Sequence, residues 1–361
     1  MVIGKLEYCN GVTAYCMNYY RKIDHQRFAV DFAIHQRTDA EDFAKDYFKE
    51  IASNGDSIFS FGGFDLKSMA SLKSRAESFF AKKKYDIVHV HVLNVAYFYL
   101  KPAMKMGIPV RIVHSHATQN SDNRVKRIRN HFLKNLGLRY CTHRIACSRL
   151  AGDYLFGQKD YSVINNAIEY RKFTFDPNSR ERIRESLNIS DQTLFIGFVG
   201  RFARQKNVMF ILEILHRLKE DDFDFKALLI GNGPLKEEME KFIRRHGLED
   251  QTRIMESCPD VHRYYSAMDA MVMPSFFEGL PVTGVEAQYA DLKCFFSDRI
   301  THEVDFGKAV FLPIGNAEIW AEQLKRIAPY PRFEVVNDAF DIDRQVSALE
   351  KFYADSLNQK K

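Results

Sequence analysis

The sequence predicts an α/β protein with two doubly wound parallel sheets, each in its own domain. Three observations support this fold class. The chain has 361 residues, which is enough for two hydrophobic cores. Short apolar segments alternate with amphipathic helical segments, as in parallel-sheet proteins. The run L-F-I-G-F-V at 194–199 is apolar almost throughout, which is typical of a strand buried on both faces.

Residues 1–172 are expected to form the first domain. A short strand at 1–4 is followed by a glycine-containing loop and a helix over 12–21. The segment Y-D-I-V-H-V-H-V at 85–92 predicts a central strand. Further strands are predicted at 27–35, 57–64, 109–115 and 143–148. Helices are predicted at 40–53, 66–83, 95–106, 120–140 and 149–156.

Residues 173–343 are expected to form the second domain, and 344–361 a final helix. The charged segment 173–188 contains Pro177 and predicts a linker that leads into a helix. Apolar runs predict strands at 194–199, 225–230, 252–255, 270–273, 294–296 and 310–313. A helix is predicted to follow the loop at 200–207 and to end at residue 219, and another is predicted to begin near residue 283. Further helices are predicted at 235–246, 261–267, 317–327 and 344–357.

Composition excludes several classes of protein. Hydrophobic residues make up 46% of the chain and charged residues 27%, as in soluble globular proteins. There is no apolar run of 18 residues to predict a membrane-spanning helix, and the first residues do not resemble a signal peptide. The six cysteines are scattered without a C-x-x-C pair, which predicts neither a zinc site nor disulfides. We therefore expect a cytoplasmic protein.

Positive charge is concentrated in the first half of the chain. Residues 1–170 contain 25 Lys and Arg against 16 Asp and Glu, a net charge of +9, whereas the whole chain has +5. The segment 120–140 predicts a basic amphipathic helix with Arg124, Lys126, Arg127, Arg129 and Lys134. Two interpretations remain open: a solvated surface helix, or contact with an anionic membrane or a lipid diphosphate. There is no motif that predicts nucleic-acid binding.

The segment 274–288, P-S-F-F-E-G-L-P-V-T-G-V-E-A-Q, carries the strongest functional signal. It follows the predicted strand 270–273, turns at Gly279 and Pro281, and becomes helical near Thr283. Ligands bind beyond the carboxyl ends of strands in such sheets, and helix N-termini favour anions. Seven residues separate Glu278 from Glu286. Two glutamates near a loop are usually solvated surface charges, but this context favours sugar hydroxyls and phosphates as ligands.

This segment resembles the E-x7-E signature of retaining glycosyltransferases of family 4, which have the GT-B fold. The likeness extends to the preceding P-S, the E-G-L-P turn and the E-A-Q of the helix. It implies two Rossmann-like domains that face a cleft, the first binding the acceptor and the second the nucleotide-sugar. In this fold the final helix often crosses back to the first domain. It also implies metal-independent transfer of a sugar from a nucleotide diphosphate-sugar, expected to be a UDP-sugar, with anomeric configuration retained. No cofactor is expected. The expected acceptor is a lipid-linked or other oligosaccharide of a bacterial capsule or exopolysaccharide, handled at the inner face of the cell membrane.

The resemblance assigns roles to residues of the second domain. The motif G-R-x-x-x-Q-K-N at 200–207 places Arg201 and Lys206 on the donor diphosphate, which suits their charges. Glu278 is expected on the transferred hexose and Glu286 on the ribose. The remaining expected binding residues come from the two neighbouring loops: Gly231, Asn232, Gly233, Gly279, Leu280, Pro281 and Val282.

The first domain is expected to contribute Asn10 and Gly11 to a phosphate-binding loop, and His116 to the donor sugar. Family members usually have two adjacent glycines in that loop, and Asn10 stands where the first is usual. Three more histidines, His89, His91 and His114, lie on the predicted strands or at their ends. A strand histidine is usually packed and hydrogen-bonded, and metal binding would require these side chains to converge.

Two other functions remain open because a fold does not fix a function. The chain could be a nucleotide-sugar epimerase or a phosphorylase on the same fold. It could also be a binding subunit without activity, as the short first strand and altered loops suggest. Retention of Arg201, Lys206, Glu278 and Glu286 argues against this last interpretation. An acceptor requirement distinguishes transfer from epimerisation.

Overall fold

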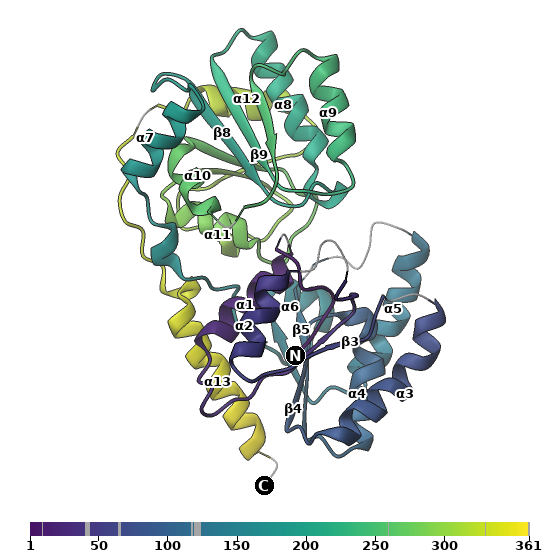
Figure 1. Cartoon of the computed structure of the whole chain (residues 1–361). Coiled ribbons are helices and arrows are strands. Elements are labelled where there is room, and N and C mark those ends of the chain that lie inside the picture. The colour runs from purple at the N-terminus through teal and green to yellow at the C-terminus, as the bar shows by residue number, and fades with distance from the viewer. Residues whose placement is uncertain are drawn as a thin grey trace. The chain divides into compact units, whose positions relative to one another are not determined.

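The structure is a computed structural model, and it describes the chain except for residues 9, 40–43, 64–65, 117, 119–123, 259, 329 and 360–361. The chain divides into two compact units (Figure 1). The N-terminal unit comprises 1–167 and 342–361, and the C-terminal unit comprises 168–341. The boundary expected between residues 172 and 173 falls within the short 3-10 helix η2, Tyr170–Phe173, of the C-terminal unit.

The N-terminal unit contains, in its described part, a seven-stranded parallel sheet with the order β3-β2-β1-β4-β5-β6-β7. The reversal of strand order beside β1 makes this sheet doubly wound, which confirms the predicted fold class. The strands are β1 Val2–Ile3, β2 Phe32–Ile34, β3 Ile58–Ser60, β4 Ile87–Val90, β5 Val110–Ser115, β6 His143–Ala146 and β7 Ser162–Val163. The helices are α1 Gly11–Lys22, α2 Lys45–Ser53, α3 Leu66–Lys82, α4 Ala96–Lys105, α5 Arg124–Leu138, α6 Arg149–Phe156 and α13 Ile342–Asn358.

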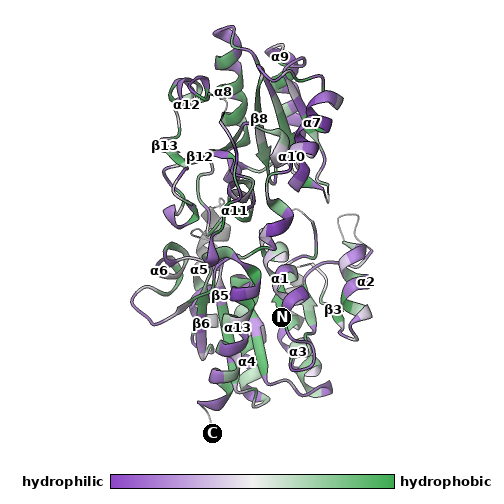
Figure 2. Cartoon of the chain, turned by 90° about the vertical axis from the view of Figure 1, so that its left-hand side faces the viewer, coloured by the Kyte–Doolittle hydropathy of each residue, from purple (hydrophilic) through white to green (hydrophobic). Residues whose placement is uncertain are grey.

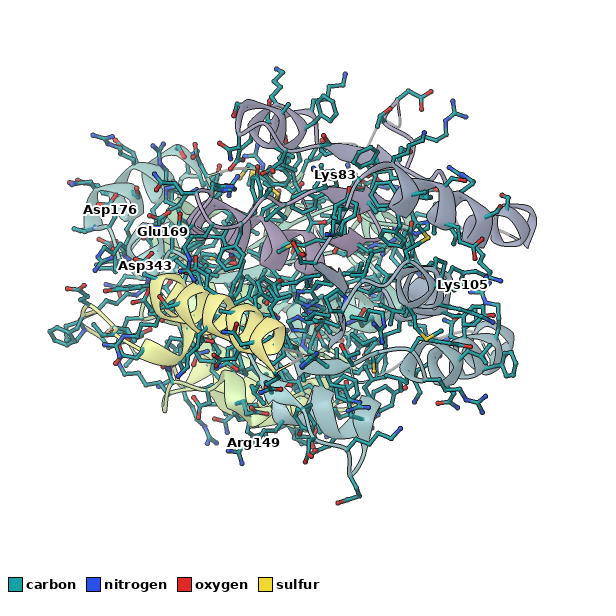
Figure 3. The ribbon with its side chains drawn as sticks, turned by 90° about the horizontal axis from the view of Figure 1, so that it is seen from below. Lys83, Lys105, Arg149, Glu169, Asp176 and Asp343 are labelled. Carbon is teal, nitrogen blue, oxygen red and sulfur yellow. The ribbon has the colours of Figure 1, made fainter. Side chains whose placement is uncertain are left out.

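Apolar helix faces cover this sheet on both sides. Helices α3, α4 and α5 pack side by side on one face, while α1 and α13 pack together on the other (Figure 1). The last helix therefore belongs to the N-terminal unit, where Val346, Leu349 and Tyr353 are buried in the core. The Nζ of Lys22 in α1 lies 3.3 Å from Oδ1 of Asp343, a residue that Figure 3 labels at the start of α13. Burial of apolar side chains rather than this exposed ion pair holds α13 in place.

The C-terminal unit contains, where described, a six-stranded parallel sheet with the order β10-β9-β8-β11-β12-β13. Helices α7 and α10 pack together, and α8 packs with α9 and α12 (Figure 1). The strands are β8 Leu194–Val199, β9 Phe225–Ile230, β10 Thr252–Met255, β11 Ala270–Met273, β12 Lys293–Ser297 and β13 Val310–Leu312. The helices are α7 Pro177–Ser186, α8 Val208–Glu220, α9 Lys236–Arg245, α10 Val261–Ala267, α11 Val282–Tyr289 and α12 Ala317–Lys325.

The core of the C-terminal unit explains why β8 is apolar throughout. This strand pairs with β9 and β11 at its two edges; on one face Leu194, Ile196 and Phe198 pack in the core with residues of α8, and on the other Gly197 lies against Met268, so residues 194–198 are buried. A methyl group on Gly197 would lie 2.0 Å from the sulfur of Met268, so this position favours glycine. Figure 2 shows hydrophobic colour along the strands and hydrophilic colour on α7. Among the described residues, no helix is both long and apolar enough to cross a membrane.

Candidate functional site

Glu278 and Lys206 form the centre of the candidate site in the C-terminal unit. Glu278 lies in the loop between β11 and α11, and Lys206 lies in the short helix η3, Arg204–Lys206, after β8. Strands β8 and β11 are neighbours, so both residues follow the carboxyl edge of the same sheet. The Lys206 Nζ lies 2.7 Å from Glu278 Oε1, and the Glu278 side chain is only 8% exposed. The buried carboxylate depends on this cation, because a buried charge without a partner is strongly destabilising.

Gln205 fixes the loop that carries Glu278. The Gln205 Nε2 donates to the Phe277 carbonyl at 3.0 Å and to Glu278 Oε2 at 3.4 Å, and the backbone carbonyl of Gln205 accepts from the Phe276 amide at 2.9 Å. The sequence-based site omitted Gln205, although the residue is part of the quoted G-R-x-x-x-Q-K-N motif. The Gln205 side chain is uncharged, and its role in the site is to orient the Glu278 carboxylate through these hydrogen bonds.

Glycines allow the loops after β8 and β9 to pack closely against each other. The Phe202 amide donates to the Asn232 carbonyl at 2.9 Å, so the two loops lie against each other. A methyl group on Gly231 would lie 2.0 Å from the Gly200 carbonyl oxygen, and one on Gly233 would lie 2.4 Å from that of Phe202. Both positions therefore require glycine for close backbone approach.

Arg201 is exposed beside these loops. In the described part of the chain its guanidinium makes no hydrogen bond or ion pair, so the structure does not bring it into contact with Lys206 or Glu278. Its exposed fork can still meet a phosphate from solvent.

The turn into α11 follows Glu278 directly in the chain. Gly279, Leu280, Pro281 and Val282 form the turn into this helix, and Leu280 and Val282 are buried. Pro281 precedes the first helical residue, and its carbonyl accepts from the Gly284 and Val285 amides at 3.1 and 3.2 Å. The four residues of this turn have uncharged side chains and lie next to the positive end of the α11 helix dipole.

Glu286 lies inside α11 and faces α10. The Tyr265 hydroxyl donates to Glu286 Oε2 at 2.9 Å, and Tyr265 is fully buried. Burial raises the pKa of Glu286 to about 7, against the opposing effects of the Tyr265 hydrogen bond and the charge of Lys172. Sequence reasoning missed Tyr265 because a tyrosine in a short helix carries no functional signal of its own.

The expected phosphate loop of the N-terminal unit is arranged as a helix cap. Asn10 Oδ1 accepts from the Val12 and Thr13 amides at 3.0 and 3.3 Å. Gly11 is the exposed first residue of α1, and an added methyl group there would meet no atom within 4 Å. Asn10 thus occupies amides that a phosphate would otherwise use, which is the structural consequence of an asparagine at this position.

The four strand histidines converge beside α1. We call His89, His91, His114 and His116 the histidine cluster. His116, expected on the donor sugar, follows β5 and is half-buried, while His114 is fully buried. His116 Nε2 lies 2.9 Å from His91 Nδ1. Burial lowers the pKa of His116 to about 3, against a hydrogen bond with Asn166, so the ring is neutral at pH 7.

Two family profiles match the chain. "Glycosyltransferase Family 4" matches residues 9–172 and "Glycosyl transferases group 1" matches residues 179–327. The chain is 29% identical over 361 residues to a putative glycosyltransferase, EpsF, of Bacillus subtilis, covering 95% of this chain and 93% of EpsF. It is 23% identical over 322 residues to an Escherichia coli UDP-Gal:alpha-D-GlcNAc-diphosphoundecaprenol alpha-1,3-galactosyltransferase, covering 82% of this chain and 81% of that protein.

Solved structures resemble the fold closely. The Anabaena HepE structure in complex with UDP-glucose superposes with a TM-score of 0.75 at 14% identity, covering 99% of each chain. The two profiles together account for most of both units, and the site combines the E-x7-E motif with the lysine that contacts its first glutamate. The chain therefore belongs to the glycosyltransferases of family 4 and has the GT-B fold.

Proposed function

We propose that the protein transfers a sugar from a UDP-sugar to a lipid-linked oligosaccharide in polysaccharide assembly, with retention of anomeric configuration. The contact between Lys206 and Glu278 at the carboxyl edge of the C-terminal sheet carries the proposal. The names of the relatives support the choice of substrates. The Escherichia coli relative is named for a UDP-galactose donor and a diphosphoundecaprenol acceptor, and HepE was solved with UDP-glucose.

The basic residues stabilise the leaving group in this proposal. As the bond between sugar and phosphate breaks, negative charge grows on the UDP diphosphate, and fixed cations lower the energy of that state. Lys206 is held in place by Glu278 and supplies a point charge, while Arg201 supplies a planar fork for two phosphate oxygens. The glycines at 231 and 233 let the loop after β9 lie against the loop after β8, and this packing fixes the backbone of both loops near Arg201 and Lys206.

The two glutamates recognise different parts of the donor. Glu278 accepts hydrogen bonds from hydroxyls of the hexose, and Gln205 keeps its carboxylate oriented. Glu286 accepts from the ribose hydroxyls, and Tyr265 fixes one of its oxygens. His116, neutral at pH 7, serves as a hydrogen-bonding partner of the sugar. The leaving phosphate oxygen takes the acceptor proton, so the proposal requires no protein general base.

Donor binding tests the proposal. A panel of nucleotide-sugars should include one UDP-sugar that raises the melting temperature, because a ligand at 100 times its Kd stabilises a protein by about 2.7 kcal/mol. Turnover of that donor should require an oligosaccharide or lipid-linked acceptor. Sugar inversion without any acceptor would indicate an epimerase instead, and release of a sugar phosphate with inorganic phosphate would indicate a phosphorylase. Binding of no nucleotide-sugar would contradict the proposal.

Donor binding should also release a proton. Glu286 has a pKa of about 7 in the ligand-free protein, and ribose hydroxyls that donate to the carboxylate favour its ionised form. Binding therefore lowers this pKa, so UDP affinity rises with pH up to about 7 and levels off above it. Calorimetry at pH 6.5 in two buffers with different ionisation enthalpies measures the released proton. Glu286→Gln should abolish the release, and an unchanged release in that variant would assign it to another group.

The N-terminal unit offers a surface for the membrane that holds such an acceptor. Phe132 of α5 is 64% exposed, and Leu150 and Tyr154 of α6 are also exposed. The Lys134 Nζ lies 5.6 Å from the centre of the Tyr154 ring, and Arg149 extends into solvent (Figure 3). Exposed apolar side chains interspersed with cations suit an anionic lipid surface. The side chains of Arg124, Lys126 and Arg127, also expected in this helix, lie outside the described residues.

Vesicle binding should depend on Phe132. Burial of a phenylalanine side chain contributes about 1.5–3 kcal/mol, so Phe132→Ala should weaken binding to phosphatidylglycerol vesicles about tenfold or more. Added salt should weaken binding further because it screens the basic residues. Phe333→Ala provides the matched control, since Phe333 is 65% exposed but lies in the C-terminal unit. Equal vesicle binding by Phe132→Ala and the wild type would contradict the assignment of this surface.

A further inference from the structure

We propose that His89, His91 and His114 bind a divalent late transition-metal ion, with Zn²⁺ as the expected occupant. One ring nitrogen from each of these residues lies within 4.8 Å of the other two. All three side chains are buried, with 2%, 4% and 0% of their surface exposed. This site lies in the N-terminal unit and is separate from the transfer chemistry proposed for Lys206 and Glu278.

The sheet brings the three rings together. Residues two apart on a strand share a face, so His89 on β4 and His91 after it project to the same side. Parallel pairing of β4 with β5 aligns Val90 with Val113, which places His91 and His114 at the next matching positions. The ring centres of His91 and His114 are 5.2 Å apart, and those of His89 and His114 are also 5.2 Å apart.

The rings have nitrogen atoms available for a ligand. The Nε2 atoms of His91 and His114 are buried and have no hydrogen-bond partner among the described residues. Such buried polar atoms are costly, and native proteins usually satisfy them. Burial also lowers the pKa of all three histidines well below its usual value, so the rings are neutral, which is the form that coordinates a metal.

Neighbouring groups already hold the outer nitrogens of two rings. His89 Nδ1 lies 2.7 Å from the Tyr353 hydroxyl, and His91 Nδ1 lies 2.9 Å from His116 Nε2. Metal-binding histidines typically use their second nitrogen in this way, which orients the ring. His89 Nε2 lies 3.2 Å from His114 Nδ1, and an ion bound to the cluster would replace this contact.

The donor set indicates the kind of ion. Three imidazoles without a carboxylate suit Zn²⁺, Cu²⁺, Ni²⁺ or Co²⁺ rather than Mg²⁺ or Ca²⁺. Zinc–nitrogen bonds of about 2.0–2.1 Å in a tetrahedron separate the ligand atoms by roughly 3.4 Å. Because no two of the ligand atoms are more than 4.8 Å apart, the rings would approach one another by at most roughly 1.4 Å to hold the ion. The ion would join β4 to β5 and, through Tyr353, to α13, which stabilises the N-terminal unit.

Metal titration of the untagged full-length protein tests the proposal. After dialysis against a chelator, the protein should take up one Zn²⁺ per chain in competition with a coloured chelator, and Zn²⁺ should raise its melting temperature. Co²⁺ should give the intense visible absorption of a tetrahedral site. His114→Gln and His91→Gln should each abolish stoichiometric uptake. Tyr353→Phe should retain the site but weaken it about 10–100-fold, because only an outer partner is lost.

His143→Gln is the matched control, because His143 is a half-buried strand histidine of the same sheet outside the cluster. It should bind Zn²⁺ like the wild type. Circular dichroism and UDP affinity show whether the variants are folded, and UDP affinity should remain unchanged because the proposed nucleotide contacts lie in the C-terminal unit. Absence of stoichiometric uptake by the wild type, or wild-type uptake by His114→Gln and His91→Gln, would overturn the proposal. If the wild type takes up Zn²⁺ but does not bind UDP, the result contradicts the proposed function and not the metal site.

Discussion

Replacing Lys206 by alanine should lower kcat about 100-fold or more. The expected loss is that of one preorganised charge that stabilises a leaving group, because the diphosphate gains negative charge as the sugar departs. Lys206 is well placed for this role, since its Nζ lies 2.7 Å from Glu278 Oε1 at the carboxyl edge of the sheet. Steady-state kinetics with the identified donor and acceptor measure the effect. Arg201→Ala should act in the same direction, and Lys241→Ala, which removes an exposed lysine of α9, should have no effect.

Loss of Lys206 also leaves the buried Glu278 carboxylate without its close cation. That change alone could distort the loop, because an uncompensated buried charge is strongly destabilising. The double variant Lys206→Ala with Glu278→Gln removes this charge. If the melting temperature recovers and the double variant turns over more slowly than Glu278→Gln alone, Lys206 acts in catalysis. If the double variant and Glu278→Gln have the same kcat, the lysine only neutralises Glu278 and the proposed role is wrong.

Glu278→Gln should depress kcat about 100-fold while it leaves UDP affinity nearly unchanged. The amide keeps the shape of the side chain but removes the charge that matters as the sugar becomes cationic. UDP contains no hexose, so its binding does not use this contact. Calorimetry of UDP binding and steady-state kinetics of the same variant measure the two effects separately. Gln205→Ala should weaken turnover in the same direction but less, because Gln205 only orients the carboxylate.

Glu286→Ala should instead weaken nucleotide binding and leave kcat nearly unchanged. It should weaken binding of both the intact donor and free UDP about tenfold or more, because the ribose is common to both and hydrogen bonds to charged groups contribute about 1.5–3 kcal/mol. Such uniform binding energy appears mainly in KM. If Glu278→Gln loses UDP binding while Glu286→Ala keeps it, the two roles are reversed. If neither variant changes binding or turnover, the E-x7-E motif has no function in this protein.

Local sequence patterns predicted most elements of both units, although the two-residue strand β7 was not among them. The apolar runs at 194–199 and 225–230 are the strands β8 and β9, and the helix predicted at 149–156 is α6. These patterns succeed because a strand buried on both faces must be apolar at every position. The N-terminal strands were overestimated: the segment 27–35 contributes only Phe32–Ile34 to the sheet. Strand ends depend on pairing with a neighbour, which local pattern does not contain.

The motifs alone located Glu278, Glu286, Arg201 and Lys206 in the sequence, because phosphates and sugar hydroxyls need those residue types near strand ends and helix starts. Only the tertiary structure decided which of them meet. Adjacent β8 and β11 bring Gln205, which is 73 residues from Glu278, into contact with it. Packing of α10 against α11 places Tyr265 on Glu286, and pairing of β4 with β5 gathers the histidine cluster. These contacts depend on strand order and helix packing, which are fixed by burial over the whole chain rather than by neighbouring residues.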